Sequence, residues 1–204
     1  MFWIYFLPMF FYLICFKISN FTPSFYHYLI LFTITIHFLK RCFEVLFLHH
    51  YSGNLSLFAI VSVVLGYSAI IGTIHWVVNI YTGKLALEKY SIIASSAIGF
   101  LIFALGEFGN LYHHYLLRKL RNDNKLDYQI PSGGFFKYVN CPHYLFEIVS
   151  WIGIALMSKY LVSFGVISFT VFYLIARSIN TTKWYKERFP NYPKERKSII
   201  PFLI

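Results

Sequence analysis

The sequence predicts an all-α fold, a multi-pass transmembrane helical bundle with about six spans. Hydrophobic residues make up 58% of the 204 residues and charged residues only 13%. A soluble domain has roughly 45–50% apolar and about 25% charged residues. The net charge of +10 is confined to segments between the apolar runs, which is typical of membrane orientation rather than of nucleic-acid binding.

Six apolar runs are long enough, or nearly so, to cross about 30 Å of hydrocarbon, which takes ~17–25 residues. They cover residues 2–16, 25–39, 57–80, 91–111, 144–158 and 161–176. The first, second and fifth runs are short, so we expect their helices to extend into the flanking residues. We expect Pro8 to bend or break the first run, and Lys159-Tyr160 to form a tight hairpin. The first run lacks a basic segment and a small-residue cleavage site, which favours a span over a signal peptide.

The distribution of basic residues predicts how the bundle is oriented in the membrane. Most of the 18 Lys and Arg residues lie in residues 40–55, 118–142 and 177–204, which share one side of the membrane in the six-span arrangement. The positive-inside rule therefore predicts that both termini are cytosolic. The chain shows no internal repeat and no low-complexity linker.

A polar stripe follows the fourth apolar run. Asn110, His114, Arg118 and Arg121 fall within about 80° of one another on a helix that turns 100° per residue. Basic residues at such a position can simply reach toward lipid headgroups. Paired guanidinium groups beside an amide and an imidazole also suit an anion pocket, because each guanidinium can bind a phosphate with two hydrogen bonds.

A turn and the start of a helix follow this stripe. Pro131 and Gly133-Gly134 mark a turn in which the backbone can approach another group closely. His143, Glu147 and Trp151 then share one helix face. An i,i+4 His/Glu pair can be half of a metal site, but the chain offers no second such pair, so we predict no metal site.

The end of the last span carries a further basic face. Arg177, Thr181, Trp184 and Arg188 share it, and a basic, aromatic tail through Arg196 closes the chain. Three basic and aromatic stretches thus converge on the predicted cytosolic face. The three cysteines, Cys15, Cys42 and Cys141, show neither pairing nor ligand spacing, so we expect free thiols.

The motifs in this half resemble those of the steroid 5α-reductase family, whose relatives include very-long-chain enoyl-CoA reductase and polyprenol reductase. The motifs are Gly109-Asn110 with Leu116-Leu117-Arg118, Tyr128-x-Ile-Pro131-x-Gly-Gly, Tyr138-Val-x-Cys-Pro-His-Tyr-x-x-Glu147, Trp184-Tyr185-x-x-x-Phe-x-x-Tyr-Pro-x-x-Arg196-Lys and Ile200-Pro-Phe. A weaker resemblance extends upstream to His37-Phe-Leu-Lys-Arg-Cys-Phe-Glu44 and His49-His-Tyr-Ser-Gly53. The resemblance divides the chain into N-terminal transmembrane helices (1–108), on the side of a lipid substrate, and a C-terminal domain (109–204) with an NADPH site.

The resemblance implies a membrane-embedded reductase of the endoplasmic reticulum that uses NADPH to saturate a carbon–carbon double bond of a lipid. The candidate lipids are a 3-oxo-Δ4-steroid-like compound, an enoyl-CoA and a polyprenoid. Asn110, Arg121, Arg177 and Tyr185 occupy positions at which the family contacts its cofactor. The further cofactor-binding candidates by motif position are Arg118, Tyr128, Glu147 and Arg196, with His114 and His143 replacing an acidic residue and an asparagine of the steroid enzymes.

The sequence departs from the steroid enzymes at the group that polarises the substrate carbonyl. These enzymes use a glutamate before a Leu-Pro step and a tyrosine after a histidine, whereas this chain has Phe6 and Phe38 there. His37 or Tyr51 is our candidate for the catalytic electrophile. The family usually has seven spans, so we expect that one N-terminal span is missing.

Two other functions remain open at this stage. A membrane methyltransferase of the isoprenylcysteine type also combines a Pro-x-Tyr-x-x-Glu turn with a basic tail to hold S-adenosylmethionine. It usually has Arg-His-Pro before that tyrosine and paired glutamates in its last helix. Here the order is Cys141-Pro-His143-Tyr, and the last helix offers only Glu187. A non-catalytic, lipid-binding family member is the second alternative.

Overall fold

The computed structural model describes residues 1–49, 56–82, 89–120 and 128–203, and the side chains of residues 80–82 and 89–94 lie outside that description. The described residues form six α-helices and no named strand. The helices are α1 (Phe2–Ile18), α2 (Phe25–Phe43), α3 (Leu57–Thr82), α4 (Lys89–Leu120), α5 (Pro142–Ser158) and α6 (Leu161–Arg188). A π-helical turn, η1 (Glu44–Leu48), extends α2, and a 3₁₀ turn, η2 (Gly134–Lys137), precedes α5.

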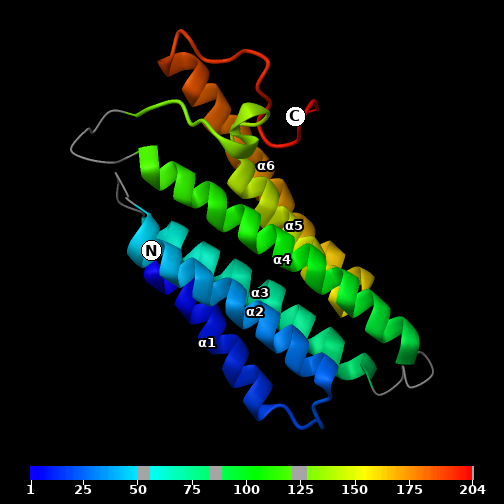
Figure 1. The fold of residues 1–204 in the computed structure, drawn as a ribbon. Coiled ribbons are helices and arrows are strands. Elements are labelled where there is room, and N and C mark those ends of the chain that lie inside the picture. Colours follow the sequence, from blue (N-terminus) through cyan, green and yellow to red (C-terminus); the bar gives the residue numbers. More distant parts are fainter. Residues whose placement is uncertain (50–55, 83–88, 121–127, 204) are drawn as a thin grey trace.

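The helices pack as a bundle in which successive helices run in opposite directions (Figure 1). The start of α1, the end of α2 and the end of α4 lie at one end of the bundle, and the C-terminal tail follows α6 beyond that end. Each of the six expected runs lies within one helix, so the order of helices predicted from the sequence is confirmed. Pro8 lies inside α1 without ending it, and the turn at Lys159 adopts a left-handed conformation with φ 66°.

Glycines allow α4 and α5 to approach each other closely. A Cβ atom placed on Gly153 would lie 2.5 Å from the Phe103 backbone nitrogen and 2.6 Å from the Gly99 carbonyl oxygen. A Cβ on Gly106 would collide with the backbone and the side chain of Ser150. Small residues let helix backbones pack this tightly inside a membrane, where no hydrophobic effect drives helices together. The pair α4/α5 is therefore a closely packed unit of the bundle.

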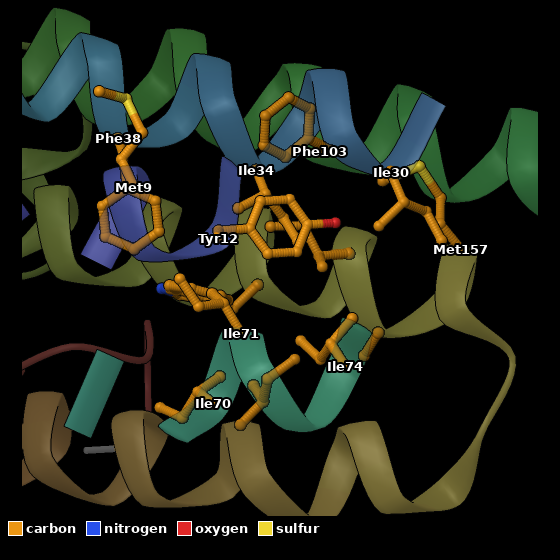
Figure 2. Packing of buried hydrophobic residues seen from close by; sticks show 14 of the residues in the cluster. Met9, Tyr12, Ile30, Ile34, Phe38, Ile70, Ile71, Ile74, Phe103 and Met157 are labelled. Carbon is orange, nitrogen blue, oxygen red and sulfur yellow. The ribbon is translucent and has the colours of Figure 1, made fainter. Parts of the chain in front are cut away.

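The remaining helices meet around an apolar core. Buried side chains from α1, α2 and α3, among them Tyr12, Ile34 and Ile71, pack beside Phe103 of α4 and Met157 of α5 (Figure 2). The outer surface is also apolar, with Leu105 and Phe169 at 66% and 74% exposure. Such a surface suits lipid, because large apolar side chains are more favourable in a hydrocarbon phase than in water.

Two of the described helices are long and apolar enough to cross a membrane by length and composition. They are Leu57–Asn79 and Leu161–Arg188, while α1 is a shorter apolar helix. The cysteines Cys15, Cys42 and Cys141 are free, as predicted. The boundary that we expect between residues 108 and 109 lies inside α4, which continues through it.

Candidate functional site

Charged and polar side chains gather between α2 and α4, inside the end of the bundle that carries the N-terminus. We call this group the polar layer. Its members are His37, Lys40, Arg41, Glu44, Glu107, Asn110 and His114, and all except Lys40 have less than 9% of their surface exposed. Ionisable groups buried in apolar helices are costly unless each has a partner, so their hydrogen bonds indicate what the layer can do.

The first part of the polar layer joins His37 to Glu107. The His37 Nδ1 atom lies 2.7 Å from Glu107 Oε1, and the Lys40 ammonium lies 3.1 Å from the other carboxylate oxygen. Lys40 also donates a hydrogen bond to the Asn110 side-chain oxygen. The remaining ring nitrogen of His37, Nε2, is buried without a hydrogen-bond partner in the described part of the chain. A buried histidine with one nitrogen fixed and the other unused offers that second nitrogen to a ligand.

The second part of the layer centres on Arg41. Its Nη1 lies 2.6 Å from Glu44 Oε2 and donates to His114 Nε2 at 3.0 Å. Because Nε2 accepts that bond, the neutral His114 ring carries its proton on Nδ1, from which it donates to His49 Nε2 at 3.0 Å. Ligand atoms of Glu44, His49 and His114 lie within 4.8 Å of one another, as in a small metal site. The Arg41 guanidinium, however, already contacts Glu44 and His114, and its fixed charge opposes a metal cation there.

The start of α5 continues the site. The Asn110 amide donates to the His143 carbonyl oxygen at 2.8 Å, and the His114 and His143 rings lie 5.1 Å apart. Both histidines lie just outside the expected spans 91–111 and 144–158. Burial, together with the Arg41 charge, lowers the pKa of His143 to about 3 and that of His114 well below its usual value. Both rings are therefore neutral near pH 7 and act through hydrogen bonds rather than charge.

Glu147 and Trp151 lie one and two turns deeper on the same face of α5. Glu147 is 2% exposed, and the Tyr67 hydroxyl donates to its Oε1 atom at 3.5 Å. The fully buried Trp151 ring lies 4.9 Å from the His37 ring. Its Nε1 atom and the Nδ1 atom of His143 are buried without a hydrogen-bond partner in the described residues. Such unpaired donors and acceptors point to a ligand, because an unpaired buried polar group costs free energy.

A basic hollow lies on α6 beside this face. Its volume is about 350 Å³, and it is lined by Arg177, Asn180, Thr181 and Trp184. Arg177 is exposed, and it donates to the Tyr144 hydroxyl at 3.2 Å and the Tyr173 hydroxyl at 3.3 Å. The Tyr144 ring in turn lies 4.2 Å from the His143 ring. Side-chain contacts thus run from the polar layer through α5 to this hollow.

Other site candidates hold the segments around the hollow in place. The Arg196 guanidinium donates to the Pro131 carbonyl at 3.0 Å and ties the tail to the turn before α5. Tyr185 packs against the Phe189 ring at 5.8 Å. The Tyr128 ring lies 4.9 Å from Trp184, and the Arg188 guanidinium lies 5.8 Å from the centre of the Tyr128 ring.

The Gly133-Gly134 turn approaches α4 rather than an open site. Gly133 and Gly134 have φ values of 89° and 50°, which favour glycine. A Cβ on Gly134 would lie 2.8 Å from His113 Nε2, and the Phe135 amide donates to that nitrogen at 3.1 Å. The close approach expected at this turn is therefore made to His113 of α4, which gives the turn a structural role.

The structure brings most of the candidates from the sequence together. Asn110, His114 and Arg118 share a side of α4, where Arg118 donates to the Leu48 carbonyl of η1 at 3.4 Å. Arg121 and Tyr51 lie outside the described residues. Sequence reasoning assigned no role to Lys40, Arg41, Glu44 and Glu107. The available signal was the i,i+3 and i,i+4 spacing of charged residues that follow an apolar run.

Comparison with known proteins identifies the family. The family model described as 3-oxo-5-alpha-steroid 4-dehydrogenase matches residues 53–204. The chain belongs to this family. It is 32% identical over 145 residues to 3-oxo-5-alpha-steroid 4-dehydrogenase 1 of Bos taurus, a match that covers 68% of the chain and 56% of the relative.

Two further relatives show the same pattern. The chain is 36% identical over 124 residues to 3-oxo-5-alpha-steroid 4-dehydrogenase 2 of Sus scrofa, covering 61% of the chain and 48% of the relative. It is 41% identical over 106 residues to a steroid 5-alpha-reductase of Gossypium hirsutum, covering 52% and 41%. The chain spans about half the length of these relatives. The resemblance drawn from the motifs after Gly109 is confirmed, and the family match includes α3 to α6 but not α1 and α2.

Proposed function

We propose that this chain is a membrane-embedded, NADPH-dependent reductase that saturates a carbon–carbon double bond of a lipid substrate. The observation that carries the proposal is the line of contacts, within the family-matched helices, from Asn110 and His114 through His143 to the Arg177 hollow. The line joins a basic surface to a buried group of hydrogen-bonding side chains. The relatives are named as steroid dehydrogenases or reductases, which favours reduction over methyl transfer.

The residues around this line fit a dinucleotide. The exposed Arg177 guanidinium offers the donors that bind phosphate oxygens, and the Trp184 ring beside it offers a flat face for a base. The Nδ1 atom of His143, which is buried and has no hydrogen-bond partner in the part of the chain that the structure describes, is a further site for a hydrogen bond. Arg177, Asn180, Thr181 and Trp184 would therefore hold NADPH on the α6 side, with Asn110, His114 and Glu147 inward of it. When bound, NADPH supplies a hydride to the carbon β to the substrate carbonyl.

The chain's own residues must hold the carbonyl oxygen of the substrate as negative charge develops on it. His37 is our candidate for this role, because its Nε2 is buried without a hydrogen-bond partner in the described segments while Glu107 lies 2.7 Å from Nδ1. Glu107 holds the ring through Nδ1, so Nε2 is the ring atom left to face the oxygen. Lys40 and Glu107 act here as positioning residues. Tyr51 remains the second candidate from the sequence.

The lipid substrate is expected to enter from the bilayer through the N-terminal helices. The candidates remain a 3-oxo-Δ4-steroid-like lipid, an enoyl-CoA and a polyprenoid. We propose six spans in the endoplasmic reticulum membrane with both termini in the cytosol, supported by the position of the basic segments at one end of the bundle (Figure 1). The basic hollow would then face the cytosolic pool of NADPH.

A binding experiment tests the proposed function. The detergent-purified chain is titrated with NADPH and, separately, with S-adenosylmethionine, and binding is followed by isothermal titration calorimetry. Saturable binding of NADPH alone is expected. Binding of S-adenosylmethionine alone supports the methyltransferase, and binding of neither supports a non-catalytic family member. The lipid composition of cells lacking this protein then identifies the substrate, because the unsaturated precursor accumulates.

A further inference from the structure

Two tyrosines meet inside the N-terminal helices, where the sequence shows only apolar spans. Tyr5 of α1 is 8% exposed and Tyr67 of α3 is partly buried. Their ring centres lie 5.9 Å apart. We call these two residues the phenol pair. A hydroxyl inside a membrane helix is retained only where it finds a partner or serves a ligand.

Each hydroxyl of the phenol pair faces a charged group from another helix. Arg41 Nη2 of α2 donates to the Tyr5 hydroxyl oxygen at 2.7 Å. This bond uses the oxygen of Tyr5 as an acceptor, and a hydroxyl that accepts from a cation becomes a stronger donor of its own proton. The Tyr67 hydroxyl donates to Glu147 Oε1 of α5 over 3.5 Å. At this length the bond is weak, so a better-placed acceptor can replace Glu147 as the partner of the Tyr67 hydroxyl.

Aromatic rings enclose the pair on the side of the proposed catalytic group. The Tyr67 ring stacks on Trp151 with 6.1 Å between ring centres and meets Phe38 edge-on at 5.4 Å. The His37 ring also contacts Trp151, at 4.9 Å. His37 Nε2 and Trp151 Nε1, two buried nitrogens without hydrogen-bond partners among the described residues, therefore lie close to the Tyr67 ring.

The donors and charges around the phenol pair indicate which kind of ligand it can bind. The phenol pair and the indole are hydrogen-bond donors, so the ligand must be an acceptor. The Arg41 charge is balanced by Glu44 at 2.6 Å, and the Glu147 carboxylate would repel an anion, so a neutral acceptor is favoured. A carbonyl oxygen on an apolar molecule satisfies both conditions, and the surrounding aromatic rings suit the apolar part.

We propose that the phenol pair binds the carbonyl oxygen of the lipid substrate, with Arg41 positioning Tyr5 and with Tyr67 turning its hydrogen bond from Glu147 to that oxygen. This inference rests on the proposed function, since it supplies two neutral donors to the oxygen on which charge develops. It extends the proposed function by adding two residues from α1 and α3 and by requiring a carbonyl in the substrate. An isolated polyprenoid double bond without a carbonyl would not use this site.

The test compares probes with and without a carbonyl. The purified chain, without NADPH, is titrated with a 3-oxo-Δ4-steroid and with a long-chain trans-2-enoyl-CoA, each beside a counterpart that lacks the carbonyl oxygen. Tryptophan fluorescence reports binding, because Trp151 contacts Tyr67. Tighter binding is expected for at least one carbonyl probe. The variants are Tyr5→Phe, Tyr67→Phe and the double variant, and the control is Tyr28→Phe, which is 52% exposed.

Each single variant should weaken binding of the carbonyl probe by roughly 2- to 10-fold, and the double variant by more, because one net hydrogen bond is lost at each position. Binding of the carbonyl-free counterpart and of NADPH should not change in any variant. Unchanged affinity for the carbonyl probe in the double variant overturns the inference. Equal losses for both kinds of probe also overturn it, because they indicate a structural role, as does a wild-type chain that does not prefer carbonyl probes.

The outcome separates this inference from the proposed function. If the double variant binds NADPH and reduces a lipid at the wild-type rate, the proposed function stands and the inference about the phenol pair is wrong. If the chain binds carbonyl probes through the phenol pair but does not bind NADPH, the inference about the phenol pair stands and the proposed function is wrong.

Discussion

The helices α4 to α6 and the helices α1 to α3 differ in how their polar residues are arranged. In α4 to α6, polar side chains follow continuous helix faces, such as Asn110, His114 and Arg118, and end at the exposed Arg177 hollow. In α1 and α3, hydroxyl groups such as those of Tyr5 and Tyr67 sit among apolar residues and meet their partners across helices. The first arrangement can be recognised from one helix at a time, and the second cannot.

This difference matches the two roles that we propose, cofactor binding by the C-terminal helices and lipid binding by the N-terminal helices. The family model covers α3 to α6 and not α1 and α2, and the basic groups that suit a cofactor lie in the matched part. The residues that we propose to contact the lipid carbonyl lie mainly on α1 to α3. A family can keep one cofactor and change its lipid, so the lipid end is where its members are expected to differ.

The largest expected effect comes from the lipid end. The double variant His37→Ala/Tyr51→Ala should lower the turnover of the true substrate by about 10²–10³-fold, because removal of a donor to a developing oxyanion has effects of this size. Its affinity for NADPH should not change. Initial rates from the decrease in NADPH absorbance measure the first effect and calorimetry the second. Leu39→Ala, at an exposed position of α2, is the control, and a double variant with full turnover would show that neither residue is the electrophile.

Variants at the proposed cofactor site should change the affinity for NADPH and leave the affinity for lipid probes unchanged. Arg177→Ala and Arg121→Ala should each weaken NADPH binding by about 1.5–3 kcal/mol, the usual contribution of a hydrogen bond to a charged group. Binding of carbonyl-bearing lipid probes should stay the same. Lys183→Ala is the matched control, since Lys183 is exposed and pairs with Glu187 at 3.9 Å on the same helix. If NADPH binds both arginine variants as tightly as the wild type, the proposed pocket is wrong.

The smallest expected effect concerns the close packing of α4 on α5 and its contribution to stability. Gly153→Ala should lower the free energy of unfolding by about 1–3 kcal/mol, because the new methyl group overlaps the α4 backbone. Gly165→Ala in α6 has open space around it and should be neutral or slightly stabilising. Thermal unfolding in detergent micelles, followed by fluorescence, compares the two. Equal midpoints for both variants would mean that close packing of α4 on α5 does not limit stability.

The sequence predicted the helices because their signal is local. An apolar run of sufficient length must form a helix in a bilayer, where each backbone group needs a partner within its own segment. The helix faces that carry Asn110, His143 and Arg177 follow from the same local periodicity. The resemblance at Gly109 to Ile204 was equally readable, because the motif residues are close together along the chain.

Tertiary structure decided which residues from different helices meet. Nothing in the apolar span around Tyr67 indicates that this hydroxyl faces Glu147 of α5, eighty positions further along the chain. The pairing of His37 with Glu107, and of Arg41 with Tyr5, likewise depends on the rotation of each helix about its own axis. That rotation is fixed by close packing, above all where glycines let α4 approach α5, and packing is a property of the assembled bundle. The sequence by itself therefore determined a basic, cofactor-like face on an all-α membrane protein, and only the fold placed the buried donors around Trp151.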